Sequence, residues 1–411
     1  MNLQPYLKFM SEQSVSDMYF TTGAPVSVRI EGVMRPVGKS MLTPGMTKKL
    51  AYDLLTPAQI QDFEKNLEMN MGMSYTDLGR FRVNIYLQRG EVSMVIRYIR
   101  SDIPTLDDLG LPDLYKKLIS EKKGLILVVG ATGMGKSTSL ASMIDHRNAS
   151  ETGHILTIED PIEFMFHHKK SIVGQREIGL DTLSFDNALR EAMRETPDLI
   201  MIGEARDRVA MESALRYADT GHLCLTTLHA TNANQTLDRI LNFFPNDAHN
   251  QILMDLSLNL KAILAQRLVT SVDGTRIAAV EVMINTPYIS SLIREADFHG
   301  IKGVMEKGGE EGMQTFDQSL YILYKKGRID LKTALANADS SSDLEWKINF
   351  GGGVESKEAK DKPDTLQFPS SPPPNAKRSL LSELKNFSQC DCELVCHQRS
   401  CVLRRSGNSS S

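Results

Sequence analysis

The first hundred residues alternate short apolar stretches with turn residues. Apolar side chains recur at every second position in several of these stretches, which is typical of half-buried strands. Between them, residues 43–66 have helical spacing, and Thr56-Pro57 supplies the cap and first turn of a second helix. Residues 1–100 are therefore predicted to form an α+β domain. Its clearest strands are expected at 26–30, 81–85 and 92–96.

From about residue 114 the pattern changes. Apolar runs now alternate with amphipathic helices such as 184–195, which begins behind a Ser184 cap. This alternation predicts an α/β domain with a mainly parallel sheet over residues 114–340. The segment before it, 101–113, holds two prolines and has no periodicity, so it is predicted to be a linker. The strands of the second domain are expected at 125–129, 155–158, 199–202 and 223–228.

Composition adds limits on location and partners. The 411 residues carry 47 basic and 51 acidic side chains, a net charge of −4, which gives no reason to expect nucleic acid as a partner. The first residues lack the basic and apolar segments of a signal peptide. No apolar run approaches the ~18 residues needed to cross a bilayer. We therefore expect a cytoplasmic protein with no membrane span.

Four of the five cysteines crowd into the end of the chain. Residues 1–389 contain only Cys224, which excludes a disulfide framework there. The other cysteines, with His397 among them, match none of the common zinc spacings, and the preceding 363–377 is rich in proline. Residues 341–411 are predicted to be a disordered tail, with a folded metal site as the alternative. The cysteines concerned are Cys390, Cys392, Cys396 and Cys401.

A phosphate-binding pattern follows the first strand of the second domain. The stretch GATGMGKST matches G-x-x-x-x-G-K-[ST], in which glycines turn backbone N–H groups inward around phosphate oxygens. Lys136 can reach the β- and γ-phosphates, the Ser137 hydroxyl can take Mg²⁺, and the next helix presents its positive end. The chain is therefore predicted to bind ATP and Mg²⁺. The nucleotide-binding residues are expected to be Gly130, Ala131, Thr132, Gly133, Met134, Gly135, Lys136, Ser137 and Thr138.

Acidic residues or a histidine follow the other three strands. Ligands of open parallel sheets bind beyond the carboxyl ends of the strands. Glu163 is expected to orient the attacking water, and Glu204 to help Ser137 hold the metal, directly or through a water. His229 is expected to contact the γ-phosphate. His222 lies more than ~20 Å away in an extended strand, so it is either a core histidine or an interface group.

Together these segments resemble the secretion ATPase superfamily, and within it the type IV pilus retraction motors of the PilT/PilU group. The resemblance covers residues 1–340 and includes the phosphate loop, TIEDPIEF at 157–164, DLIMIGEARD at 198–207 and GHLCLTTLHATNA at 221–233. It implies a PAS-like N-terminal domain followed by a RecA-like P-loop NTPase domain. It also implies subunits arranged as hexameric rings.

The resemblance further implies that arginines of the N-terminal domain approach a nucleotide held between the two domains. Arg82 and Arg97 hold the matching positions, and a guanidinium can spread charge over a transferring phosphoryl group. Assembly and secretion ATPases of the superfamily typically carry a further N-terminal domain and a four-cysteine insert, so the retraction type is favoured. A chain that continues past residue 340, with a distinct 286–300 stretch, favours the accessory PilU branch.

The leading hypothesis is a cytoplasmic hexameric ATPase at the inner-membrane base of the pilus. It would couple ATP hydrolysis to pilus retraction and twitching motility as accessory to a principal retraction ATPase. Its partners would be other copies of itself, that principal ATPase and the inner-membrane platform protein. Three alternatives stay open: a pilus-assembly or type II secretion ATPase, a ring subunit that binds ATP mainly to assemble, and a RecA-like nucleic-acid translocase, which the acidic balance and 6% aromatic content disfavour.

Overall fold

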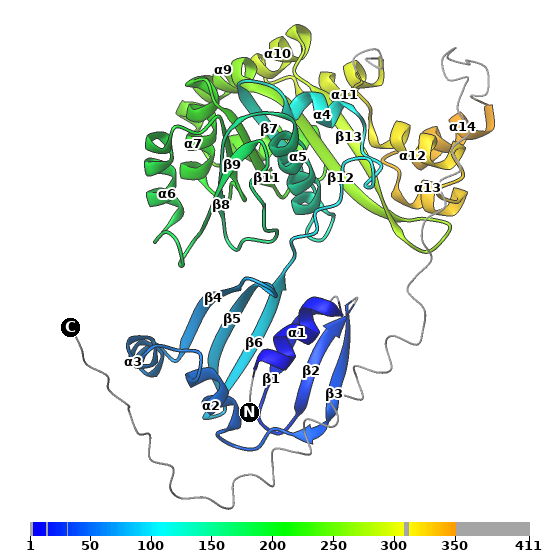
Figure 1. The fold of residues 1–411 in the computed structure, drawn as a ribbon. Coiled ribbons are helices and arrows are strands. Elements are labelled where there is room, and N and C mark those ends of the chain that lie inside the picture. Colours follow the sequence, from blue (N-terminus) through cyan, green and yellow to red (C-terminus); the bar gives the residue numbers. More distant parts are fainter. Residues whose placement is uncertain (1–2, 14, 31, 308–311, 351–411) are drawn as a thin grey trace, which may run out of the picture. The chain divides into compact units, whose positions relative to one another are not determined.

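The computed structural model describes residues 3–13, 15–30, 32–307 and 312–350. They form two units, one of residues up to 99 and one from residue 100 onward (Figure 1). The predicted fold class is confirmed, because an antiparallel sheet with helices is followed by a mainly parallel sheet with helices. The cysteine-rich end of the chain, where a metal site was the alternative prediction, lies outside the described residues.

The first unit is built on a six-stranded antiparallel sheet in the order β3-β2-β1-β6-β5-β4. Its helices pack on the sheet, α1 against β1, α2 against β6 and α3 against β4. Helix α3 begins as predicted, because the Thr56 side chain accepts a hydrogen bond from the Gln59 N–H behind Pro57. The elements are α1 (Gln4–Glu12), β1 (Val15–Phe20), β2 (Pro25–Ile30), β3 (Val33–Met41), α2 (Met46–Tyr52), α3 (Pro57–Asn66), β4 (Glu68–Tyr75), β5 (Gly79–Gln88) and β6 (Glu91–Ile99).

The second unit is built on a seven-stranded sheet in the order β13-β12-β7-β11-β10-β8-β9. Its first half comprises α4 (Leu114–Ile119), β7 (Gly124–Val129), α5 (Lys136–Ser150), β8 (Gly153–Glu159), β9 (Ser171–Glu177), α6 (Phe185–Ala192), a 3₁₀ turn (Met193–Glu195), β10 (Leu199–Ile202), α7 (Arg208–Asp219) and β11 (Leu223–Leu228). Its second half comprises α8 (Ala233–Leu241), a 3₁₀ turn (Asn246–Ala248), α9 (His249–Asn259), β12 (Leu260–Thr270), β13 (Arg276–Ile284), α10 (Pro287–Arg294), α11 (Phe298–Lys307), α12 (Phe316–Lys325), α13 (Leu331–Asn337) and α14 (Ser341–Phe350).

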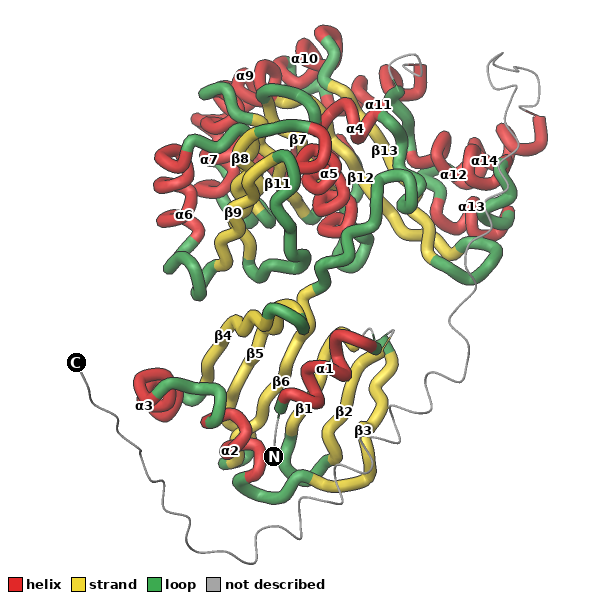
Figure 2. The backbone as a smooth tube through the Cα atoms, viewed as in Figure 1, coloured by secondary structure: helices red, strands yellow, loops and turns green. Residues whose placement is uncertain are grey.

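The four predicted strands of this unit are confirmed as β7, β8, β10 and β11, side by side in the sheet (Figure 2). All neighbouring pairs among them are parallel. Leu199 of β10 lies opposite both Ile155 and Leu223, so three strands run level with one another. Their carboxyl ends therefore meet at one edge, as the sequence predicts.

Both faces of the parallel sheet are covered by helices. In Figure 1, α6, α7 and α9 lie over one face, and α4 and α5 lie over the other. On β7, Leu125 and Leu127 belong to the core under the first group, whereas Ile126 and Val128 belong to the core under the second. A strand buried on both faces needs apolar side chains throughout, which explains the uninterrupted apolar runs in the sequence.

Three expected boundaries differ in the structure. Residues 101–113 are not a free linker, because Leu106 and Leu111 are buried in the core of the second unit. The helix expected over 184–195 ends at Ala192, where the chain tightens into a 3₁₀ turn. The tail expected to be disordered from residue 341 begins with α14, held by the buried Leu344.

The central position of β11 gives a test of this packing. Leu225→Ala should lower the free energy of unfolding by about 2–5 kcal/mol, because a fully buried side chain leaves a cavity. Ile172→Ala on the edge strand β9 is the matched control, since Ile172 is 65% exposed, and should change it by about 0.5 kcal/mol or less. Urea unfolding followed by circular dichroism measures both, and equal losses would contradict the described core.

Candidate functional site

A cavity of about 490 Å³ lies at the carboxyl edge of the parallel strands. Its lining includes Lys136 and Ser137 from the phosphate loop, Glu163 after β8, Glu204 after β10 and His229 after β11. The structure thus brings together the residues that the sequence places at the ends of four strands. Because they come from separate segments, only the parallel register of the sheet gathers them.

The phosphate loop joins β7 to α5 through glycines with positive φ. Gly135, with φ +82°, directly precedes the first residue of α5, and a Cβ there would lie 2.9 Å from Nε2 of Gln266. The Lys136 ammonium donates to the carbonyls of Gly130 at 2.8 Å and Ala131 at 3.0 Å. Burial lowers the pKa of Lys136, while two nearby carboxylates oppose this shift. The Lys136 ammonium is therefore held against the loop in the wall of the cavity.

The two predicted glutamates have different partners. Glu163 accepts a hydrogen bond at 3.1 Å from the Ser137 hydroxyl, the group that the sequence assigns to Mg²⁺. Glu204 accepts from Nε of Arg206 at 2.7 Å and lies 3.0 Å from Nε2 of His229. One carboxylate therefore faces the phosphate loop, and the other orients the histidine.

Glu159 is a buried site residue to which the sequence assigned no separate role. It ends β8, lines the cavity and is only 6% exposed. Burial raises the pKa of Glu159 to about 7, against hydrogen bonds from Thr157, Gln175 and the backbone N–H of Glu163. This carboxyl group therefore anchors the segment that carries Glu163. The acidic residues at the end of β8 marked this region in the sequence, but the burial of Glu159 could not be predicted from them.

Strands β12 and β13 support the phosphate loop from the side. Gln266 accepts a hydrogen bond from the Ser139 hydroxyl at 2.7 Å. Arg276 donates to the Gly133 carbonyl at 2.9 Å and lines the cavity. Neither residue was predicted, because no local motif marks a contact with a loop more than a hundred residues earlier. Arg206 did have a signal, since it follows Glu204 in the charged end of the segment 198–207.

Three other predicted residues come from other parts of the described structure. Arg82 and Arg97 belong to the first unit, opposite one another on β5 and β6, and Nε of Arg97 pairs with Asp17 at 2.8 Å. Their predicted approach to a nucleotide stays a prediction. His222 lies just before β11, at its amino end, with Nδ1 3.3 Å from the carbonyl oxygen of Tyr217. It thus stands at the end of β11 opposite to His229.

A model of the type II/IV secretion system protein family matches residues 3–311, well over half of the chain. The chain belongs to this family. The match spans the phosphate loop and the segments that carry Glu163, Glu204 and His229. The superfamily resemblance predicted from the sequence is thereby confirmed.

Individual relatives of this secretion family match most of the chain. The type IV pilus ATPase PilU of Pseudomonas aeruginosa is 51% identical over 352 residues, covering 85% of this chain and 92% of that protein. The type IV pilus retraction ATPase PilT of the same bacterium is 40% identical over 338 residues, covering 82% and 98%. A crystal structure of the pilus retraction motor PilT with bound ADP superposes with a TM-score of 0.78 at 43% identity, covering 84% and 99%.

The similarity to an ADP-bound relative supports nucleotide binding by this family member. The cavity offers the matching features, a glycine-rich loop, a lysine and the amino end of α5. Across the residues described in this structure, no helix has both the length and the apolar character that a membrane span requires.

Gly135 gives a test of the phosphate loop. Gly135→Ala should weaken binding of a fluorescent ATP analogue by about tenfold or more, because a Cβ would press on the Gln266 amide and displace loop N–H groups. Gly274→Ala is the matched control, with φ +81° and nothing within 4 Å of the added Cβ. It carries the same backbone strain but should bind normally. Equal losses in the two variants would show that strain alone is responsible.

Proposed function

We propose that this chain is an ATPase that drives type IV pilus retraction as accessory to a principal retraction ATPase. The observation that carries the proposal is that Lys136, Ser137, Glu163, Glu204 and His229 line one cavity at the carboxyl edge of the sheet. The extent of the similarity to PilU, 92% of that protein at 51% identity, supports the pilus assignment and the accessory branch.

The cavity suits a nucleoside triphosphate. Residues 130–138 would hold its phosphates through inward N–H groups, the Lys136 ammonium and the positive end of α5. A side chain at Gly130 would lie 2.6 Å from the Gln266 carbonyl, so the loop at this point tolerates only glycine. Gly130 therefore lets the phosphate loop pack directly against the backbone of β12.

Mg²⁺ would bind beside the Ser137 hydroxyl, with the Glu163 and Glu204 carboxylates on the same cavity wall. Within the described ranges, no group of three or more His, Cys, Asp or Glu side chains could hold a metal. The ion would thus take its remaining oxygen ligands from phosphate and water, which is usual for Mg²⁺ in nucleotide sites. When bound, it would neutralise charge on the transferring phosphoryl group.

The two glutamates and the histidine would divide the work of hydrolysis. Glu163 would orient the attacking water and accept its proton, since it lies beside the phosphate loop. His229 would contact the γ-phosphate, held in orientation by Glu204. Arg206 would hold Glu204 in place by donating a hydrogen bond to its other oxygen.

In the cell, we propose a homohexamer on the cytoplasmic side of the inner membrane that acts on the platform protein of the pilus. The family resemblance motivates the ring and the platform contact. A net charge of −4 and an aromatic content of 6% weigh against nucleic acid as the moved substrate. Salt-sensitive stimulation of hydrolysis by DNA would instead support the translocase.

Two substitutions separate binding from chemistry. Lys136→Ala should abolish nucleotide binding, because it removes the cation of the phosphate loop. Glu163→Gln should bind ATP normally and lose about a hundredfold or more in kcat, the usual contribution of a general base. Glu212→Gln, which breaks a surface ion pair with Arg208, is the control and should behave as wild type. Equal hydrolysis rates in wild type and Glu163→Gln would exclude this role for Glu163.

Pilus retraction measured after deletion of each ATPase in turn tests the accessory role. Deletion of this protein should reduce the retraction force while retraction continues, and deletion of the principal ATPase should stop it. An accessory motor adds force to a cycle that it does not start. Loss of pilus extension would point instead to an assembly ATPase. An unchanged retraction force after deletion of this protein would contradict its assignment to the pilus.

A further inference from the structure

The β12–β13 hairpin contacts the phosphate loop on one side and the C-terminal helices on the other. Gln266 accepts a hydrogen bond from the Ser139 hydroxyl in the first turn of α5 and packs beside Gly135 of the loop. The next residue, Arg267, faces away, because neighbouring side chains of a strand alternate. Arg267 donates to the Asn337 carbonyl at 3.0 Å, and its guanidinium lies 3.8 Å from the centre of the Phe316 ring. The hairpin thus connects the region of the phosphate loop with the C-terminal helices, although no sequence motif links the two.

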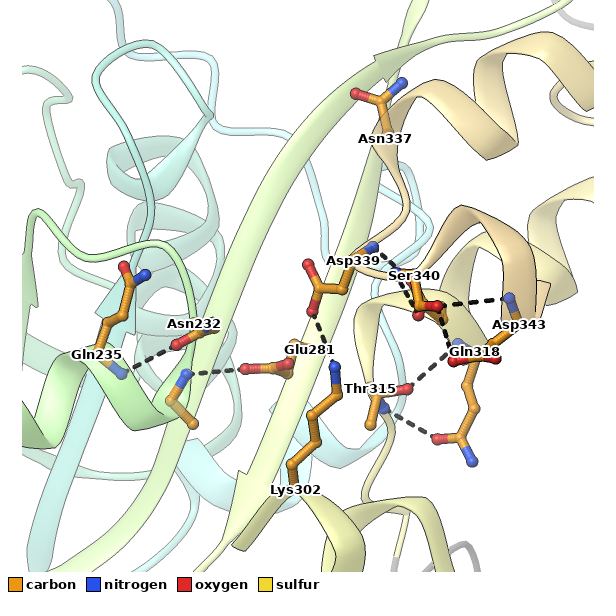
Figure 3. Close-up of polar contacts among 12 residues, drawn as sticks. Asn232, Gln235, Glu281, Lys302, Thr315, Gln318, Asn337, Asp339, Ser340 and Asp343 are labelled. Carbon is orange, nitrogen blue, oxygen red and sulfur yellow. Dashed lines mark hydrogen bonds and ion pairs between the residues drawn. The ribbon is translucent and has the colours of Figure 1, made fainter. Parts of the chain in front are cut away.

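On β13, Glu281 reaches the start of α8. Its carboxylate is 3% exposed and accepts a hydrogen bond at 2.8 Å from the backbone N–H of Ala233, the first residue of α8 (Figure 3). Asn232 caps the same helix. The loop before it begins at His229, whose ring contacts Glu204 at 3.0 Å. This loop is therefore fixed by one carboxylate at each end.

Charged groups from β12 and the C-terminal region act on Glu281. Asp339, after α13, pairs with Arg267 at 2.7 Å. It also pairs with Lys302 of α11 at 3.6 Å (Figure 3). Burial raises the pKa of Glu281 to about 7; Asp339 adds to the rise, and the N–H at the start of α8, Arg267 and Lys302 oppose it. A neutral side chain would avoid the cost of a buried charge. A carboxylate kept at such a cost is a candidate for function.

We infer that Glu281 is a positioning residue, whose carboxylate fixes the start of α8 and thereby the loop that presents His229 to Glu204. The inference rests on the proposed ATPase function. The contact is a charge-assisted hydrogen bond at a helix amino end, where a negative charge is favourable. The Arg267–Asp339 pair extends the same support to the C-terminal helices.

Glu281→Gln tests the charge, since it keeps the volume and the accepting oxygen. At pH 8 the variant should lose about threefold or more in kcat for ATP, with KM changed by about twofold or less, because a positioning role affects the reacting state. At pH 6, where Glu281 is mostly neutral in the wild type, the difference in kcat between wild type and variant should become smaller.

Stability gives a second readout of Glu281→Gln. The raised pKa of Glu281 means that the stability this residue contributes to the fold is lost as pH rises through about 7. The variant should therefore melt no lower than wild type at pH 8.

Asp330→Ala is the matched control, because Asp330 caps α13 through the Thr333 N–H in the same C-terminal region. It should lower the melting temperature and leave kcat unchanged. A Glu281→Gln variant with wild-type kcat at pH 8 would overturn the inference, as would a lower melting temperature with unchanged kcat.

A second measurement keeps the inference testable if Glu281→Gln does not fold. Lys302→Met removes a half-exposed cation that favours ionised Glu281. Amide hydrogen exchange at Ala233 should then become faster at pH 7. An unchanged exchange rate would contradict the inference that Glu281 fixes the start of α8. This readout does not need hydrolysis. If the wild type hydrolyses no ATP, the proposed function fails, while the exchange rate still decides whether Glu281 holds α8.

Discussion

The parallel register of four central strands is the constraint on which the site depends. Neighbouring strands that run level end at the same edge, so residues far apart in sequence become neighbours in space. Lys136, Glu163, Glu204 and His229 share a cavity for this reason. The apolar residues that fix the register on both faces of the sheet are thus also responsible for the geometry of the charged edge.

A strand buried on both faces leaves a strong signal in a sequence, and a contact between distant segments leaves none. The predicted runs 199–202 and 223–228 coincide with β10 and β11, because every residue in them is buried and most are apolar. The phosphate loop carries its own local pattern. Gln266 and Arg276 could not be found this way, since each contacts the loop only through the folded sheet. Leu106 lies in a proline-containing stretch without a period, so its burial had no signal either.

The polar residues of the cavity are supported by carboxyl groups that are buried. Glu159 accepts from the backbone of Glu163, and Glu281 accepts from the first N–H after the loop that carries His229. Burial raises the pKa of both supporting groups to about 7. Sequence shows such residues as acids, but only the fold shows which acids are buried and what they hold.

Helix α14 also carries Trp346, the single tryptophan of the chain. Its indole is 64% exposed, and its ring lies 6.1 Å from that of Phe350. Intrinsic emission excited at the red edge of protein absorption therefore originates from one known place, seven residues beyond Asp339. The fluorescence of Trp346 therefore reports on the packing of α14 without a label or a mutation.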